Sequence, residues 1–179
     1  MREPTIARNY AQALFEVGER HDETERYADL MEGLAGAIEH EPAVHAVLAS
    51  PRVTKPQKQA ILTAALHKYA SEPFLRFLQA VVKRGRQGIL PAISREYLEL
   101  VDQKFNRIHA GITLAREPDK ALQEAVRTKL SEVIGKEVIP HFRADPAILG
   151  GLILRLNDRI IDGSLRRKMM NLKRQLLRT

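Results

Sequence analysis

The spacing of the hydrophobic residues changes once along the chain, near His109–Gly111, and that change limits the folds available to it. Upstream, apolar residues recur every three to four positions, which is the period of an α-helix with one buried face. Downstream, Ile112 and Leu114 alternate with less hydrophobic neighbours, as in a β-strand. The sequence therefore predicts a mainly α protein with two domains. Residues 1–108 should form a helical bundle, and residues 109–179 should form a small α/β (α+β) domain.

Capping residues divide the first domain into helices. Residues 5–20 are expected to form the first helix, with Thr5 as its N-terminal cap. Thr54–Gln57 reads as a capping box, and Ser71 as the cap of a later helix. Residues 90–108 carry the most regular apolar stripe, so the last helix of the bundle is expected there.

The first helix carries two neighbouring apolar stripes. One consists of Ile6, Tyr10, Ala13 and Val17, and the other, of smaller residues, consists of Ala7, Ala11, Leu14 and Gly18. Such a helix is either packed between neighbours of its own bundle or partly reserved for a partner. Wide apolar helix faces are usually buried, so we favour the first interpretation without excluding the second.

The second domain shows helix and strand signals in alternation. Pro118 and Asp119 open a helix that Gly135 closes, with these residues expected to be buried: Leu122, Val126, Leu130, Val133 and Ile134. Pro140 places the following strand at a sheet edge. Two further apolar runs are joined by Asn157–Asp158, the expected hairpin turn. A final helix carries the stripe Leu165, Met169, Leu172 and Leu176.

The residue types argue against catalysis. The chain has no cysteine, which excludes disulfides, zinc ribbons and thiol nucleophiles. None of the six histidines has another three or four positions away, so no helix presents a pair of metal-ligating imidazoles. A glycine–serine–glycine nucleophile elbow is missing as well. We therefore expect no catalytic residue, no metal and no cofactor.

Two glycine-containing segments near the C-terminus have structural explanations. Gly150 and Gly151 precede a strand and lack the Lys-Ser/Thr ending of a phosphate loop, so a bulge or a close backbone approach is expected there. In Asp162-Gly163-Ser164, the Asp or Ser side chain can cap the last helix while Gly163 supplies an unusual backbone angle. Both segments are expected to set up the hairpin and the start of the final helix.

Three segments resemble the delta subunit of F-type ATP synthases, whose mitochondrial counterpart is the oligomycin-sensitivity-conferring protein. They are "IARNYAQALFEVG", "VVKRGRQGILPAI" and "DPAILGGLILRLNDRIIDGSLRRKMMNLKRQL". They occur in the family's order and span essentially the whole chain. Extra basic residues after Ser164, and two valines where the family's fifth helix often turns polar, are mild departures. The resemblance implies a six-helix N-terminal bundle followed by a small α/β domain.

The resemblance also implies a function. The family member is a non-catalytic stator subunit that links the catalytic head to the peripheral stalk, so that proton-driven rotation is coupled to ATP synthesis. One copy per complex would lie peripherally at the cytoplasmic face of the inner (plasma) membrane, without spanning it. By matched position, the groove for an alpha-subunit N-terminal helix would include Tyr10, Ala13, Leu14, Phe77, Ala80 and Val81. The residues binding the stalk's b-type subunits would include Leu165, Arg166, Met169 and Leu172.

The charge distribution leaves an alternative open. The formal net charge is +7, and the last 17 residues after Asp162 contain six basic residues and no acid. A basic nucleic-acid-binding adaptor would have such an end, although residues 1–50 carry ten acids against four bases. A standalone regulatory helical module is a third interpretation. We favour the stator, for which no nucleic acid is expected as a partner.

Overall fold

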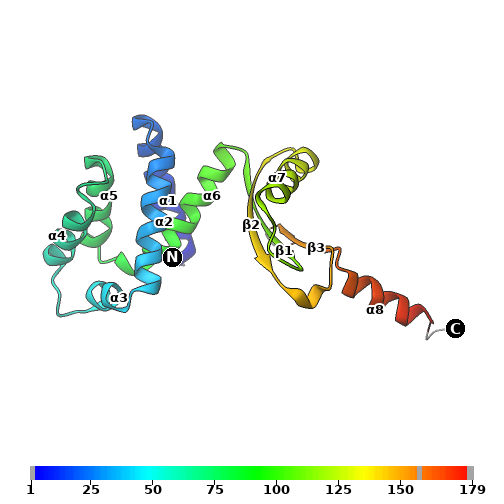
Figure 1. The fold of residues 1–179 in the computed structure, drawn as a ribbon. Helices are drawn as coiled ribbons and strands as arrows, with labels where there is room; N and C mark the ends of the chain where they lie inside the picture. The colour runs from blue at the N-terminus through cyan, green and yellow to red at the C-terminus, as the bar shows by residue number, and fades with distance from the viewer. Residues whose placement is uncertain (1–2, 157–158, 177–179) are drawn as a thin grey trace. The chain divides into compact units, whose positions relative to one another are not determined.

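The computed structural model describes residues 3–156 and 159–176, and the chain divides into two compact units, residues 1–104 and 105–179 (Figure 1). The division comes slightly earlier than the change of hydrophobic period suggested. The last helix of the first unit ends at Lys104, and the first strand begins at Arg107, so Ile108 belongs to a strand and not to the predicted helix 90–108.

The first unit is a bundle of helices, as predicted. Along its described residues it contains six α-helices and one 3-10 helix: α1 (Glu3–His21), α2 (Thr24–His40), α3 (Pro42–Ala49), α4 (Lys55–Leu66), α5 (Glu72–Lys83), η1 (Gln87–Ile89) and α6 (Leu90–Lys104). The mainly α fold with a six-helix N-terminal bundle is therefore confirmed.

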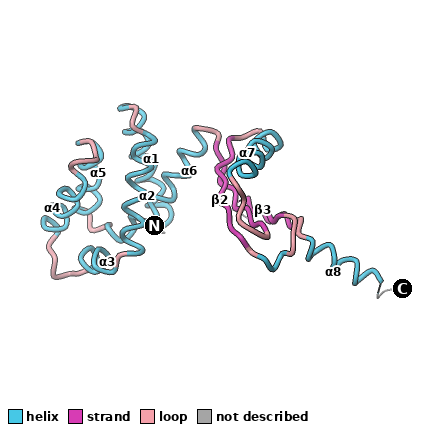
Figure 2. The backbone as a smooth tube through the Cα atoms, in the orientation of Figure 1, coloured by secondary structure: helices cyan, strands magenta, loops and turns pink. Residues whose placement is uncertain are grey.

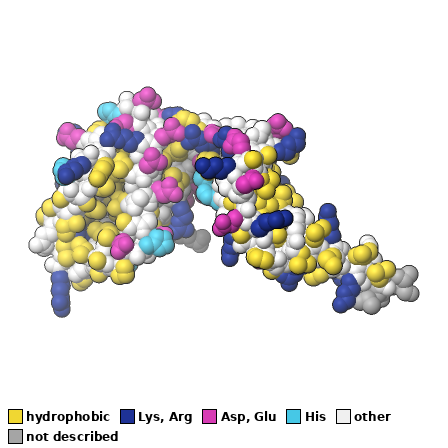
Figure 3. Space-filling model, viewed as in Figure 1, with side chains coloured by type: hydrophobic (Ala, Val, Ile, Leu, Met, Phe, Trp, Pro, Cys, Tyr) yellow, Lys and Arg dark blue, Asp and Glu magenta, His cyan; other side chains and the backbone are white. Residues whose placement is uncertain are grey.

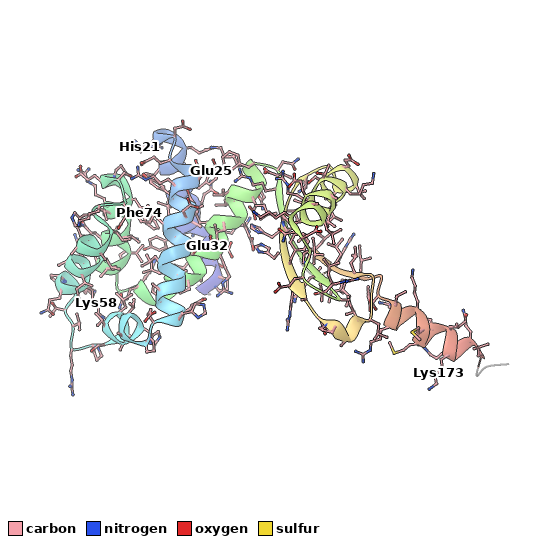
Figure 4. All side chains as sticks on the ribbon, viewed as in Figure 1. His21, Glu25, Glu32, Lys58, Phe74 and Lys173 are labelled. Carbon is pink, nitrogen blue, oxygen red and sulfur yellow. The ribbon has the colours of Figure 1, made fainter. Side chains whose placement is uncertain are left out.

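Aromatic side chains tie the helices of the bundle together. The Tyr97 hydroxyl of α6 donates a hydrogen bond of 3.0 Å to the carbonyl of Thr24 at the start of α2. Phe74 reaches from α5 toward α2 (Figure 4), where its ring centre lies 5.1 Å from that of Tyr27. Tyr27, Phe74 and Tyr97 have no exposed surface. Because Gly18 of α1 faces this cluster, a β-carbon there would come within 3.0 Å of the Tyr97 oxygen.

The helix starts agree only partly with the predicted caps. Thr5 lies inside α1, which begins at Glu3, so it is not the N-cap. Thr54 and Gln57 form the predicted capping box of α4, with the Thr54 amide donating to the Gln57 side chain at 2.9 Å. Ser71 stands at the N-cap position of α5, but its hydroxyl pairs with that of Tyr27 at 2.9 Å instead of capping. The tertiary hydrogen bond to Tyr27 therefore replaces the local capping hydrogen bond of Ser71.

Over its described residues, the second unit is a four-stranded sheet with two α-helices. Its elements are β1 (Arg107–Leu114), α7 (Lys120–Ile134), β2 (Glu137–Ala144), η2 (Pro146–Ile148), β3 (Leu152–Leu156), β4 (Arg159–Asp162) and α8 (Leu165–Leu176). The strand order is β2-β1-β3-β4. The β1 and β2 strands are parallel and joined through α7, whereas β1–β3 and β3–β4 are antiparallel. As predicted from Pro140, β2 is an edge strand.

The helix α7 packs against the sheet (Figure 2) and closes a small core. Its side chains Val126, Leu130 and Ile134 lie against a buried cluster of strand residues, namely Ala110, Ile112, Val138 and Leu154. The predicted burial of Leu122 and Val133 is wrong, because they are 45% and 74% exposed. Leu122 lies in the first turn, and Val133 is rotated about 100° from Ile134 around the helix axis. The expected helix ends are confirmed: the Asp119 carboxylate caps the start and Gly135, with φ 71°, ends the helix.

The predicted turn at Asn157–Asp158 lies outside the described residues. The strands on either side pair as an antiparallel ladder, with Ile153 opposite Asp162 and Leu156 opposite Arg159.

Candidate functional site

The two apolar stripes of α1 have different environments. The small-residue stripe is buried in the bundle, where Ala7, Ala11 and Leu14 have no exposed surface. The second stripe is only partly covered: Tyr10 is half-buried and Ala13 is exposed. Burial within the bundle is therefore confirmed for the small-residue stripe, whereas binding of a partner by the second stripe stays a prediction. The exposed stripe remains available to another chain.

An open groove of about 530 Å³ lies between this stripe and α5. Its lining residues are Ile6, Asn9, Tyr10, Ala13, Phe77, Ala80, Arg84 and Arg86. The two helices run antiparallel, because the end of α1 meets the start of α2 at Gly18–Glu23 and Tyr27 of α2 meets Phe74 near the start of α5. Because Ala13 and Ala80 have small side chains, another helix has room to approach α1 and α5 closely.

Two contacts connect the walls of the groove: one joins two aromatic rings, and the other joins a guanidinium to a tyrosine. The Tyr10 and Phe77 rings meet edge to face, with centres 6.2 Å apart. The Arg86 guanidinium lies 5.5 Å from the centre of the Tyr10 ring and donates a hydrogen bond of 3.2 Å to its hydroxyl. Both contacts link the α1 wall to α5 or to the turn that follows α5. Contacts within the bundle therefore form the groove without another chain.

Of the six predicted groove residues, four line the groove and two do not. Tyr10, Ala13, Phe77 and Ala80 come together on it. Leu14 and Val81 have no exposed surface and belong to the bundle core. Each follows a groove residue by one position, and one step along a helix turns a side chain by about 100° into the interior. The expectation that these two residues face a partner is therefore corrected.

The residues predicted to bind the stalk lie along α8, where hydrophobic side chains are exposed (Figure 3). Leu165 is 46% exposed, Met169 62% and Leu172 56%. These three residues and Leu176 follow one another at helical spacing, and Arg166 is exposed beside them. We call Leu165, Met169, Leu172 and Leu176 the α8 stripe. Contiguous exposed apolar surface of this kind is a common feature of interaction sites.

Side-chain hydrogen bonds fix the start of α8. The Ser164 hydroxyl accepts from the Arg167 amide at 3.2 Å, which makes Ser164 the N-cap. The Asp162 carboxylate in turn accepts from the Ser164 amide at 2.9 Å and lies 3.8 Å from the Arg167 guanidinium. The hydrogen bonds from Ser164, followed by the charges of Arg167 and Arg166, hold the pKa of Asp162 below its usual value.

The glycine pair packs directly against this segment. The Gly163 amide donates to the Leu152 carbonyl at 2.9 Å, and the Leu165 amide donates to the Gly150 carbonyl at 2.9 Å. Gly151 has φ 77°, and a β-carbon on it would lie 2.5 Å from the Gly163 carbonyl oxygen. The expected unusual backbone angle thus belongs to Gly151. Gly163 does not have a positive φ, but an added β-carbon would approach the Leu152 carbonyl to 3.2 Å.

Sequence reasoning missed two features. Ile6, Asn9, Arg84 and Arg86 also line the groove; the "KRGR" segment around Gly85 was the available signal for the two arginines. His109 and His141, 32 positions apart, meet across β1 and β2 with Nδ1 and Nε2 2.8 Å apart. Only strand pairing could have predicted this contact.

Over residues 3–156 and 159–176, no cluster of three or more His, Cys, Asp or Glu side chains could hold a metal ion. Among the helices of the same residues, none combines the length and the hydropathy that a bilayer span requires.

Comparison with known proteins identifies the family. The family model described as ATP synthase delta (OSCP) subunit matches residues 6–176. The chain is 41% identical to ATP synthase subunit delta of Gemmatimonas aurantiaca, over 96% of this chain and 93% of that protein. It is 31% identical to the same subunit of Desulforamulus reducens, over 96% and 95%. A chain of the Toxoplasma gondii mitochondrial ATP synthase hexamer has the same fold, with a TM-score of 0.70 at 20% identity and coverage of 96% and 97%. This chain therefore belongs to the ATP synthase delta (OSCP) subunit family.

Proposed function

We propose that this protein is the stator subunit that joins the catalytic head of an F-type ATP synthase to its peripheral stalk. Its role is structural and non-catalytic. It holds the head still while the rotor turns, so that proton-driven rotation is coupled to ATP synthesis. The observation that carries the proposal is an open groove in one unit together with an exposed apolar stripe on the last helix of the other. Two separate docking surfaces are what a linking subunit requires.

The groove between α1 and α5 is the proposed site of the alpha-subunit N-terminal helix. Tyr10, Ala13, Phe77 and Ala80 supply its apolar part. A helix in a groove gains stability mainly from burial of apolar surface, at about 25 cal/mol per Å². Because the groove is held by contacts within the bundle, little ordering energy is lost when the partner docks.

The α8 stripe is the proposed site of the stalk's b-type subunits. It pairs an exposed apolar surface with a basic one, since five basic residues lie on α8 and no acid does. An amphipathic stalk helix with acidic flanks would complement both properties. One copy of the chain would then join one head to one stalk, peripherally at the cytoplasmic face of the membrane.

A binding comparison tests the proposal. A synthetic peptide of the alpha subunit's N-terminal segment and a generic DNA duplex are titrated separately into the full-length protein at matched ionic strength. The stator role requires saturable binding of the peptide and no binding of the duplex. Duplex binding that falls steeply with salt, without peptide binding, would instead support a nucleic-acid adaptor.

A further inference from the structure

The groove between α1 and α5 is apolar at one end and basic at the other. Because the two helices are antiparallel, Ala13 lies toward Phe77, whereas Ile6 lies toward the end of α5 that carries Arg84. Arg86 joins Arg84 at this end and contacts Tyr10. The pair Arg84 and Arg86, which we call the arginine end of the groove, therefore borders only one end of the apolar floor.

The chain turn after α5 sets the position of the arginine end. The Gly85 amide donates to the Val82 carbonyl at 2.8 Å, and the Arg86 amide donates to the Val81 carbonyl at 3.1 Å. With Gly85 at φ 70°, these two bonds form the Schellman motif that ends a helix. The motif turns the chain so that Arg86 reaches back over Tyr10. The turn thus positions the Arg86 backbone, and the ring face and hydroxyl of Tyr10 position its guanidinium.

The two arginines have no anionic partner within the described part of the chain. The ion pairs found there join other residues: Arg76, the arginine of α5, is paired with Glu72. Arg86 is half-buried and directs one of its N–H groups to a neutral tyrosine hydroxyl. A guanidinium has five N–H donors, so most donors of this pair remain for a ligand.

We propose that the helix occupying the groove places a carboxylate against Arg84 and Arg86, and that this contact sets the direction and register of the docked helix. The inference rests on the proposed function, which supplies the helix. The partner is then an amphipathic helix with a small-residue apolar face and an acidic group at one end of that face. Arginine forks match carboxylates in a bidentate manner, and the docked helix shields the pair from water. A helix docked in the reverse direction would leave this carboxylate over the apolar end, near Ala13 and Phe77.

The experiment combines variants of the protein with variants of the ligand. The alpha-subunit N-terminal peptide is compared with a peptide in which every Glu and Asp is replaced by Gln and Asn, in titrations against the full-length chain. The double variant Arg84→Gln/Arg86→Gln is the test, and Arg76→Gln, on the preceding helix α5 and outside the groove, is the control. Circular dichroism verifies that each variant is folded.

We expect the double variant to weaken binding of the natural peptide about tenfold or more. The neutral peptide should bind the wild type about as weakly as the natural peptide binds the double variant, and the double variant should weaken the neutral peptide far less than the natural one. The control Arg76→Gln should bind the natural peptide like the wild type. Natural and neutral peptides of equal affinity, or a double variant that binds like the wild type, would overturn the inference while leaving the proposed function standing. Failure of both peptides to bind the wild type would overturn the proposed function and the inference with it.

Discussion

A β-carbon added to Gly151 would lie 2.5 Å from the carbonyl oxygen of Gly163, closer than two such atoms approach in proteins. The contact joins the segment before β3 to the segment that starts α8. Gly151 also has φ 77°, in the left-handed region that favours glycine. Two independent constraints therefore require glycine at this position.

The substitution Gly151→Ala should destabilise the second unit by more than about 1 kcal/mol, because the strained angle alone has that cost and the backbone clash adds to it. Hydrogen exchange of β3 and β4 amides measures the loss. Gly150→Ala is the matched control, since its β-carbon would meet only the movable end of the Leu165 side chain, at 2.8 Å. Equal protection in both variants would contradict the role assigned to the Gly151–Gly163 contact.

The Tyr97–Thr24 hydrogen bond should be measurable as stability of the bundle. Tyr97→Phe removes the only hydroxyl bonded to that carbonyl in the described structure and should cost about 0.5–1.5 kcal/mol. Chemical denaturation of the variant, with unchanged helicity, checks the value. Because the ring stays in place, a loss of about 3 kcal/mol or more would mean that the packing around Gly18 also depends on the hydroxyl.

Alkaline pH provides a second test of the same residue. Burial raises the pKa of Tyr97 well above its usual value. The folded state therefore keeps the proton after the unfolded chain has lost it. The stabilisation that the buried, protonated Tyr97 gives the folded state is complete below about pH 10. It is lost as the pH rises through the folded-state pKa of this residue. Denaturant titrations at about pH 9 and 11 should show a smaller alkaline loss for Tyr97→Phe than for the wild type, and an identical loss would contradict the assignment.

At acid pH the start of α8 should weaken. Since hydrogen bonds from Ser164 depress the pKa of Asp162, its stabilising contribution is present above the ordinary carboxyl pKa of about 4 and is lost as the pH falls through the depressed value. Asp162→Asn keeps an acceptor for the Ser164 amide but removes the charge. Amide exchange in α8 should therefore differ between wild type and variant at about pH 6 and converge toward about pH 3. A difference that stays constant over this range would contradict the assignment.

The bundle should fold without the second unit. All residues lining the groove belong to residues 1–104. A chain ending at Lys104 should be highly helical by circular dichroism and should unfold cooperatively. A disordered fragment would contradict the independence of the first unit.

Local patterns predicted most of the fold. The change of period, the capping box at Thr54–Gln57 and the ends of α7 at Asp119 and Gly135 were readable from sequence, because each depends on neighbouring residues. Features that depend on residues far apart in the sequence could not be predicted in this way. Ser71 gives its hydroxyl to Tyr27, 44 positions away, and Leu14 and Val81 were assigned to the groove although they face the core.

The same distinction applies to the two proposed docking surfaces. The α8 stripe could be located because one helix carries all of it. The groove needs α1 and α5 side by side, and its arginine end needs the turn at Gly85, so Arg84 and Arg86 could not be assigned from spacing alone.

We propose that two separate surfaces of this chain bind two different partners. One measurement tests it directly: calorimetric titration of the alpha-subunit N-terminal peptide, and of a fragment from the C-terminal end of a b-type stalk protein, into Ala13→Asp and into Met169→Asp. Ala13 is exposed in the groove and Met169 is exposed on α8, so neither change should disturb the fold. A charge buried by a partner costs several kcal/mol, so each variant should weaken its own ligand about a hundredfold. Ala13→Asp should bind the stalk fragment normally, and Met169→Asp should bind the alpha peptide normally. Loss of both ligands in one variant, or of neither in both, would contradict the claim.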